Sequence, residues 1–91
     1  MRSVVISDHA RFEMDRRRVR EEDVRKVALS PEQVVSSRKG RMVHQSRVTD
    51  PVSRSAMLLR VVVEERAGAL FVVTAYRTSK VDKYWQPEAE P

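Results

Sequence analysis

Two β-branched, apolar runs near the end of the chain constrain its fold more than any other stretch. Met57 to Val63 reads MLLRVVV and Leu70 to Tyr76 reads LFVVTAY, with Arg66-Ala67-Gly68-Ala69 between them. Both runs have the length and the residue types of β-strands. They predict a β-hairpin, and its second strand leads into a basic, aromatic segment that ends at Trp85.

The residues before this hairpin divide into short helices and strands. The side-chain oxygens of Ser7 and Asp8 predict the start of a first helix over 9–17, because they can cap free backbone amides. Acidic residues at 21–23 favour the start of a second helix, which carries apolar residues at helical spacing. Strands are expected at 3–6, 33–37 and 41–48.

This order predicts an α+β domain, in which two N-terminal helices pack on a mainly antiparallel, twisted sheet of four to five strands. The 91 residues suit one domain, which we place at 1–85, with a frayed tail at 86–91. Arg60 interrupts the longest apolar run, so no membrane span is expected. Without a recognisable secretory leader or any cysteine, the sequence favours a cytoplasmic location.

The charge balance favours an anionic partner. The chain has 18 Lys and Arg residues against 13 Asp and Glu residues, a net charge of +5 and a pI near 10.2. Such a balance suits nucleic acid or an acidic protein, although it can also serve only to keep a surface solvated. The cations gather at 16–20, 38–47 and 77–83.

Several classes of chemistry find no support in the sequence. With two glycines there is no phosphate-binding loop, and with His9 and His44 as the only imidazoles we expect no metal site and no cofactor. Arg, Lys, His, Tyr and Gln remain. These side chains can cleave RNA without a metal: the 2′-hydroxyl attacks the adjacent phosphate while an acid, a base and cations assist.

Arg60 is the most informative single residue. It lies among Leu and Val residues in a strand that should be central, where a charge is costly unless it is paired or faces a wet cleft. Its neighbours depend on the hairpin register. An even loop places Arg60 near Ala75 and Arg77, whereas an odd loop places it opposite Tyr76.

Other polar residues complete the candidate site, each with an alternative structural explanation. His9 and Tyr76 are candidates for acid and base, although His9 also suits an incidental place in the first turn of its helix. A free tyrosine titrates at about pH 10, so a base role for Tyr76 requires cations beside it. Candidates for RNA contact, which alternatively form solvated or packed surfaces, are Arg41, Gln45, Arg47, Arg77, Lys80, Lys83 and Tyr84.

Two groups of motifs resemble a family of small uncharacterised bacterial domains over about residues 4–85. The opening group contains SDHARFEM at Ser7 to Met14, followed by Arg17, Glu22-Asp23-Val24, Pro31-Glu32-Gln33-Val34 and Gly40-Arg41. The closing group contains VTAYRTSK at Val73 to Lys80 and Lys83-Tyr84-Trp85. That family is in turn similar to RelE-like toxins of the barnase/EndoU/colicin/RelE group of RNases.

The resemblance implies a RelE-like fold, metal-independent endoribonuclease activity and an antitoxin protein as partner. The family's recurrent polar positions fall on His9, Arg41, Thr74, Tyr76, Lys80 and Lys83, and Arg60 falls on a sheet position that is basic in such toxins. Two positions depart from the pattern. Glu13 stands where the opening helix of the family usually has Arg, which argues against a catalytic role for this helix. Arg18 stands where the family has a Gly in a left-handed turn, and this change affects only the turn.

The leading hypothesis is therefore a toxin-like endoribonuclease that cleaves mRNA, free or on the ribosome, by 2′-hydroxyl transesterification. His9, Arg60 and Tyr76 would be its catalytic residues. One alternative is a non-catalytic module that binds RNA or a protein through the same scaffold. Another is that the basic surface serves mainly to dock an acidic antitoxin, with salt-sensitive affinity.

Overall fold

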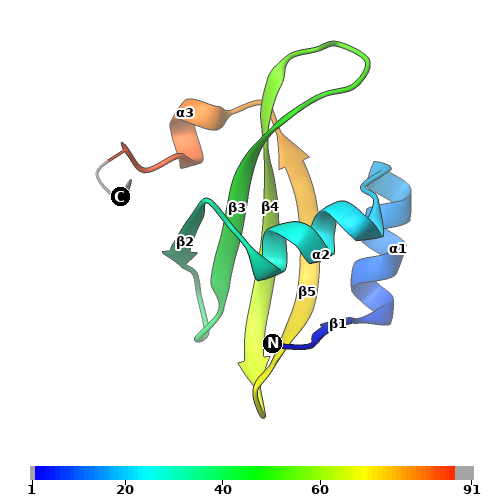
Figure 1. Ribbon diagram of the computed structural model, residues 1–91, viewed down its shortest axis with the longest axis vertical. Helices are drawn as coiled ribbons and strands as arrows, with labels where there is room; N and C mark the ends of the chain where they lie inside the picture. Colours follow the sequence, from blue (N-terminus) through cyan, green and yellow to red (C-terminus); the bar gives the residue numbers. More distant parts are fainter. Residues whose placement is uncertain (1, 88–91) are drawn as a thin grey trace.

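The computed structural model describes residues 2–87. Figure 1 shows an α+β architecture in which helices and strands follow the order β1-α1-α2-β2-β3-β4-β5-α3. The α+β class predicted from the sequence is confirmed. The elements are β1 (Val4–Ile6), α1 (Asp8–Arg17), α2 (Glu21–Leu29), β2 (Gln33–Ser36), β3 (Met42–Thr49), β4 (Ala56–Arg66), β5 (Ala69–Thr78) and α3 (Val81–Tyr84).

The five strands form one mixed sheet in the order β1-β5-β4-β3-β2. Neighbouring strands from β2 to β5 pair antiparallel, whereas β1 pairs parallel to β5 through its three residues. The long β4–β5 hairpin therefore lies in the middle of the sheet, as its apolar composition predicted. The short first strand lies at one edge and β2 lies at the other.

The start and end of α1 follow from local chemistry. Ser7 caps the helix, because its Oγ accepts a hydrogen bond from the backbone N–H of Ala10 at 3.0 Å. At the other end Arg18 adopts the left-handed conformation with φ of 56°. The sequence already marked this position as one that a glycine would normally occupy.

One hydrophobic core joins the helices to one side of the sheet, which we call the inner face. Its strand residues include Leu59, Val61 and Val63 of β4, and they share a buried cluster with residues of both long helices. The three residues that give α2 its apolar spacing, Val24, Val27 and Ala28, are all buried, whereas Leu29 at its end is exposed.

A β-bulge decides the hairpin register. Arg66 pairs with Ala69 across a two-residue turn, in which Ala67 and Gly68 both have positive φ. This even loop alone would place Ala75 opposite Arg60. The register shifts by one residue between Val62 and Val63, however, so that Tyr76 lies opposite Arg60.

The segment after β5 is more ordered than the sequence suggested. The four-residue helix α3 follows at once, and Figure 1 shows this segment beside the upper part of the sheet. Gln86, which we expected in a frayed tail, exchanges two hydrogen bonds with Gln33. The rest of that expected tail, 88–91, lies outside the described residues. Between residues 2 and 87, no helix has the length and apolarity needed to cross a membrane.

Candidate functional site

A row of polar side chains crosses the side of the sheet opposite the inner face. Gln33 pairs with Gln45, Gln45 pairs with Arg60, and Arg60 pairs with Tyr76, one residue from each of four adjacent strands. We call these four residues the polar row and this side the outer face. Directly paired residues project from the same face of a sheet, so the row is continuous.

Arg60 lies at the centre of the polar row and is only 9% exposed. Its Nε donates a hydrogen bond to Gln45 Oε1 at 2.9 Å. One terminal nitrogen donates to the Tyr76 hydroxyl oxygen at 2.6 Å. The guanidinium is therefore fixed between two neutral partners, one on each neighbouring strand.

Arg60 has no carboxylate partner among residues 2–87, whereas other arginines, such as Arg17, Arg47 and Arg77, form ion pairs there. Arginine keeps its charge at any accessible pH, so the free-energy cost of its burial cannot be avoided by losing a proton. Neither structural alternative, a local acid or an exposed sheet face, accounts for Arg60.

The C-terminal segment covers part of the polar row. The ring of Tyr84 stacks on Arg60, with 4.0 Å from the guanidinium carbon to the ring centre. Gln45 donates to the Tyr84 carbonyl oxygen at 3.1 Å and to Gln33 Oε1 at 2.8 Å. Gln45, predicted as an RNA contact, thus supports both Arg60 and this covering segment.

Trp85 and Arg47 form a second contact of that segment with the outer face. The guanidinium of Arg47 lies 4.2 Å from the Trp85 ring centre, and it also pairs with Glu32 at 3.2 Å. The hydrogen bonds from Arg47 hold the pKa of Glu32 below its usual value. Trp85 therefore anchors the segment to the sheet.

Arg17 of α1 brings a second guanidinium to Tyr76. It donates to Thr74 Oγ1 at 3.3 Å and to the Ala75 carbonyl oxygen at 3.1 Å, along the edge of β5. Its guanidinium carbon lies 5.9 Å from the Tyr76 ring centre, and that of Arg60 lies 5.7 Å from it. Tyr76 is therefore flanked by two cations, one from β4 and one from α1.

Other predicted site residues lie apart from this cluster. His9 is exposed near the start of α1, eight residues from Arg17, or roughly 12 Å along the helix axis. Arg77 pairs with Leu59, so it projects to the inner face, where it contacts Asp50 at 3.3 Å. Lys80 and Lys83 are exposed at α3, although the Lys83 ammonium lies 5.2 Å from the centre of the Tyr84 ring and so approaches the cluster.

Arg41 is also separate from the polar row. It precedes β3 and lies four residues from Gln45, or roughly 13 Å along an extended strand. Its Nε is buried and has no hydrogen-bond partner in the part of the chain that the structure describes. Of the site residues predicted from the sequence, the structure brings together Gln45, Arg60, Tyr76 and Tyr84. Arg47 lies two residues further along β3 from Gln45, on the same face of the sheet.

Sequence reasoning missed Arg17 and Gln33 as parts of the site. Arg17 was one of several consecutive arginines, 16–18, and nothing in that run distinguishes the one that reaches the sheet. Gln33 began a predicted strand. Its side chain is 4% exposed, and a buried glutamine must find hydrogen-bond partners, so its polarity in an apolar strand was the available signal.

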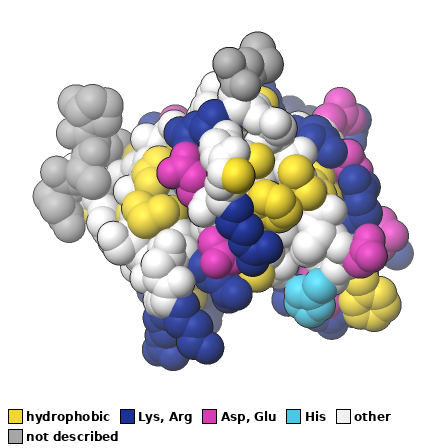
Figure 2. Space-filling view, turned by 90° about the horizontal axis from the view of Figure 1, so that it is seen from below, with side chains coloured by type: hydrophobic (Ala, Val, Ile, Leu, Met, Phe, Trp, Pro, Cys, Tyr) yellow, Lys and Arg dark blue, Asp and Glu magenta, His cyan; other side chains and the backbone are white. Residues whose placement is uncertain are grey.

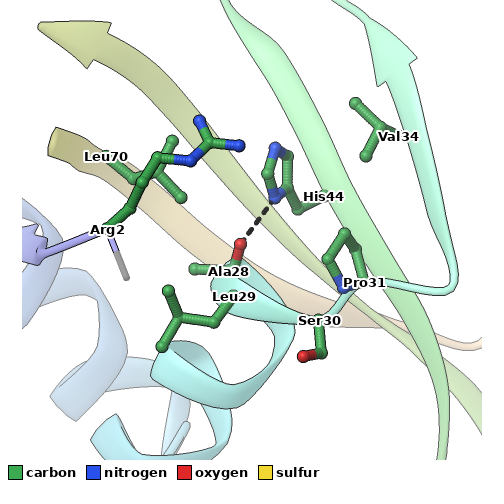
Figure 3. A pocket seen from close by; sticks show the side chains of 8 residues that line it. All are labelled: Arg2, Ala28, Leu29, Ser30, Pro31, Val34, His44 and Leu70. Carbon is green, nitrogen blue, oxygen red and sulfur yellow. Dashed lines mark hydrogen bonds between the residues drawn. The ribbon is translucent and has the colours of Figure 1, made fainter. Parts of the chain in front are cut away.

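A pocket with mainly aliphatic walls lies elsewhere on the molecule. It has a volume of about 480 Å³, and its lining includes Leu29, Val34, Leu70 and His44. Figure 3 shows the His44 ring directed at the end of α2, where Nδ1 lies 2.8 Å from the Ala28 carbonyl oxygen. Burial lowers the pKa of His44, which favours the neutral ring.

On the face drawn in Figure 2, the basic residues do not form a single patch. Figure 2, seen from below the view of Figure 1, shows Lys and Arg side chains interspersed with Asp and Glu side chains over that face. Overall charge therefore says little about where an anion would bind. The buried cation of the polar row is a more specific indication.

Comparison with protein-family models gives one match, which spans residues 6–77. It is a domain of unknown function, DUF4258. The chain belongs to this family. Neither the curated proteins nor the solved structures contain a match to the chain. Membership of an uncharacterised family agrees with the motif resemblance, whereas a relationship to RelE-like toxins remains a hypothesis.

Proposed function

We propose that this DUF4258 domain is a toxin-like endoribonuclease that acts on RNA without a metal ion, with its site at the outer face of the sheet. Arg60 would bind the scissile phosphate and Tyr76 would act in proton transfer. The proposal includes a RelE-like scaffold, a cytoplasmic location, mRNA as substrate and an antitoxin protein as partner. The cytoplasmic location rests on the amino-acid composition and the N-terminal sequence, and the other points rest on the motif resemblance.

The observation that carries the proposal is the buried Arg60, which has no carboxylate partner among residues 2–87. A guanidinium that is 9% exposed and bound to neutral groups keeps most of its attraction for an added anion. Phosphate fits this site because its oxygens match the planar donors of arginine. A site that bound only neutral groups would gain nothing from the charge.

The arrangement also suits the chemistry of RNA cleavage. The ribose 2′-oxygen forms a bond to phosphorus and loses its proton to solvent water, while the bond from phosphorus to the 5′-oxygen breaks. The Tyr76 hydroxyl accepts from Arg60, so its own proton is free to pass to the departing 5′-oxygen. Arg60 then stabilises both the phenolate and the charge on the phosphate.

A non-catalytic RNA-binding module is the second candidate, and the cover over Arg60 favours it. The Tyr84 ring lies 4.0 Å from the Arg60 guanidinium carbon, and His9 is exposed near the end of α1 opposite to Arg17. A phosphate could still contact the remaining donors of Arg60 without any transfer of a proton. In this candidate function, the site binds the RNA phosphate but does not cleave the RNA.

Labelled RNA incubated with the protein in EDTA, with and without ribosomes, separates the two candidates. The endoribonuclease proposal predicts products with 2′,3′-cyclic phosphate ends, and predicts that Tyr76→Phe and Arg60→Ala abolish them. Arg38→Ala is a matched control, because it removes an exposed cation outside the polar row. Binding that Arg60→Ala weakens, without cleavage, would support the second candidate. If the Arg60→Ala and Arg38→Ala variants bind RNA equally well, both candidates fail.

A further inference from the structure

The α1 side of the site carries an acid where the family resemblance expects a cation. Glu13 accepts hydrogen bonds from Arg16 and Arg17, each at 3.0 Å, and its side chain is only 15% exposed. The bond from Arg16 is the main cause that lowers the pKa of Glu13, with further contributions from the charges of Arg16, Arg17 and His9. Glu13 is therefore a fixed negative charge within the site.

Arg17 is held from two directions. One terminal nitrogen donates to Glu13, on the same helix, while the other donates to Thr74 and to the Ala75 carbonyl on β5. This clamp fixes a side chain that would otherwise have many rotamers. It places the Arg17 guanidinium on the same phenol ring that Arg60 contacts.

We infer that Glu13 is a positioning residue, which holds Arg17 as the second phosphate-binding guanidinium of the site. The inference rests on the proposed function. Arg60 and Arg17 would each bind oxygens of one RNA phosphodiester beside the Tyr76 hydroxyl. The acid at position 13 then supports the site, although its charge alone would repel RNA.

This role predicts an effect of opposite sign to simple electrostatics. Glu13→Gln raises the net charge by one unit, so a purely electrostatic model predicts tighter binding of RNA. If Glu13 instead positions Arg17, the same change releases the guanidinium and weakens binding. Glu21 provides a matched control, because it also bridges two arginines, Arg11 and Arg25, but contacts none of the site residues.

The experiment measures binding of a short single-stranded oligouridylate, 2′-O-methylated so that it cannot be cleaved, by fluorescence anisotropy. We expect Glu13→Gln to weaken binding about tenfold, the lower end for residues that orient a ligand-binding side chain. We expect Glu21→Gln to leave it unchanged or slightly tighter. Equal behaviour of the two variants would overturn the inference.

A double-mutant cycle tests whether Glu13 acts through Arg17. Arg17→Lys keeps the charge but loses the planar fork, so it should weaken binding as much as Glu13→Gln does. Combining the two should cost no more than either alone, whereas additive losses would contradict the inference. Glu13→Asp replaces Glu13→Gln if thermal melting shows that the latter does not fold. If the wild type does not bind, or Arg60→Ala has no effect, the proposed function itself fails.

Discussion

Adjacent residues of β4 meet two different environments. Leu59 and Val61 enter the hydrophobic core of the inner face, where they are 2% and 0% exposed. Arg60, between them, enters the polar row of the outer face. The first environment is explained by the stability that apolar burial supplies. The second is not, since Arg60 has no counter-ion among residues 2–87 and burial of such a charge costs stability. This difference indicates a functional role for Arg60.

His44 and Arg60 sharpen the contrast, because both are buried polar residues. His44 is 7% exposed, but it can remain neutral, and the Ala28 carbonyl accepts its Nδ1 proton. A structural role accounts for it completely. Arg60 cannot become neutral, and its hydrogen-bond partners carry no charge. Burial alone therefore does not mark a functional residue; burial of an uncompensated charge does.

The largest predicted effect concerns the inner face. Leu59→Ala removes a buried side chain from the core and leaves a cavity, so we expect the free energy of unfolding to fall by about 2–5 kcal/mol. Urea unfolding followed by circular dichroism measures this change. The remaining folded protein should bind RNA with unchanged affinity. A selective loss of RNA affinity would show that the two faces are not separate.

Arg60→Met tests the outer face, where we expect the opposite effect on stability from that of Leu59→Ala. The apolar side chain removes the burial cost of the charge, so we expect stability to hold or to rise by about 1–2 kcal/mol. RNA affinity, measured by anisotropy, should fall at least tenfold because the phosphate loses a buried donor group. Marked destabilisation would instead indicate that Arg60 serves the fold.

Arg18→Gly tests a residue that belongs to neither face. A glycine adopts the left-handed conformation at φ 56° without steric strain, so we expect about 1 kcal/mol of added stability. Thermal unfolding measures it. Lys39→Gly is the matched control, because Lys39 is also a cation in the left-handed conformation, at φ 58°, in another turn. Unequal effects of Arg18→Gly and Lys39→Gly on RNA affinity would place Arg18 in the site.

The smallest effect is the pH dependence from His44. Burial lowers the pKa of His44 in the folded protein below its ordinary value of 6.5. The folded state therefore prefers the neutral ring, and stability is lost as pH falls from about 6.5 through that lowered pKa. Denaturant unfolding at pH values above those at which carboxylates titrate should show this loss of stability. His44→Gln should remove it, and His9→Gln should not.

The amino-acid sequence by itself determined the local elements. Strand-forming residues in two runs predicted the central hairpin, Ser7 predicted the start of α1, and apolar spacing predicted the buried side of α2. Each of these depends on neighbouring residues only. The same reasoning identified Arg60, because a charge within an apolar strand is conspicuous without any knowledge of its partners.

Only the tertiary structure decided what surrounds Arg60. The bulge between Val62 and Val63 turned an even hairpin loop into a register that pairs Arg60 with Tyr76. Arg17 of α1, which is 57 residues from Thr74 in the chain, reaches this pair from one side. Tyr84 of α3 covers Arg60. Such contacts depend on the packing of distant segments, and local residue preferences carry no information about that packing.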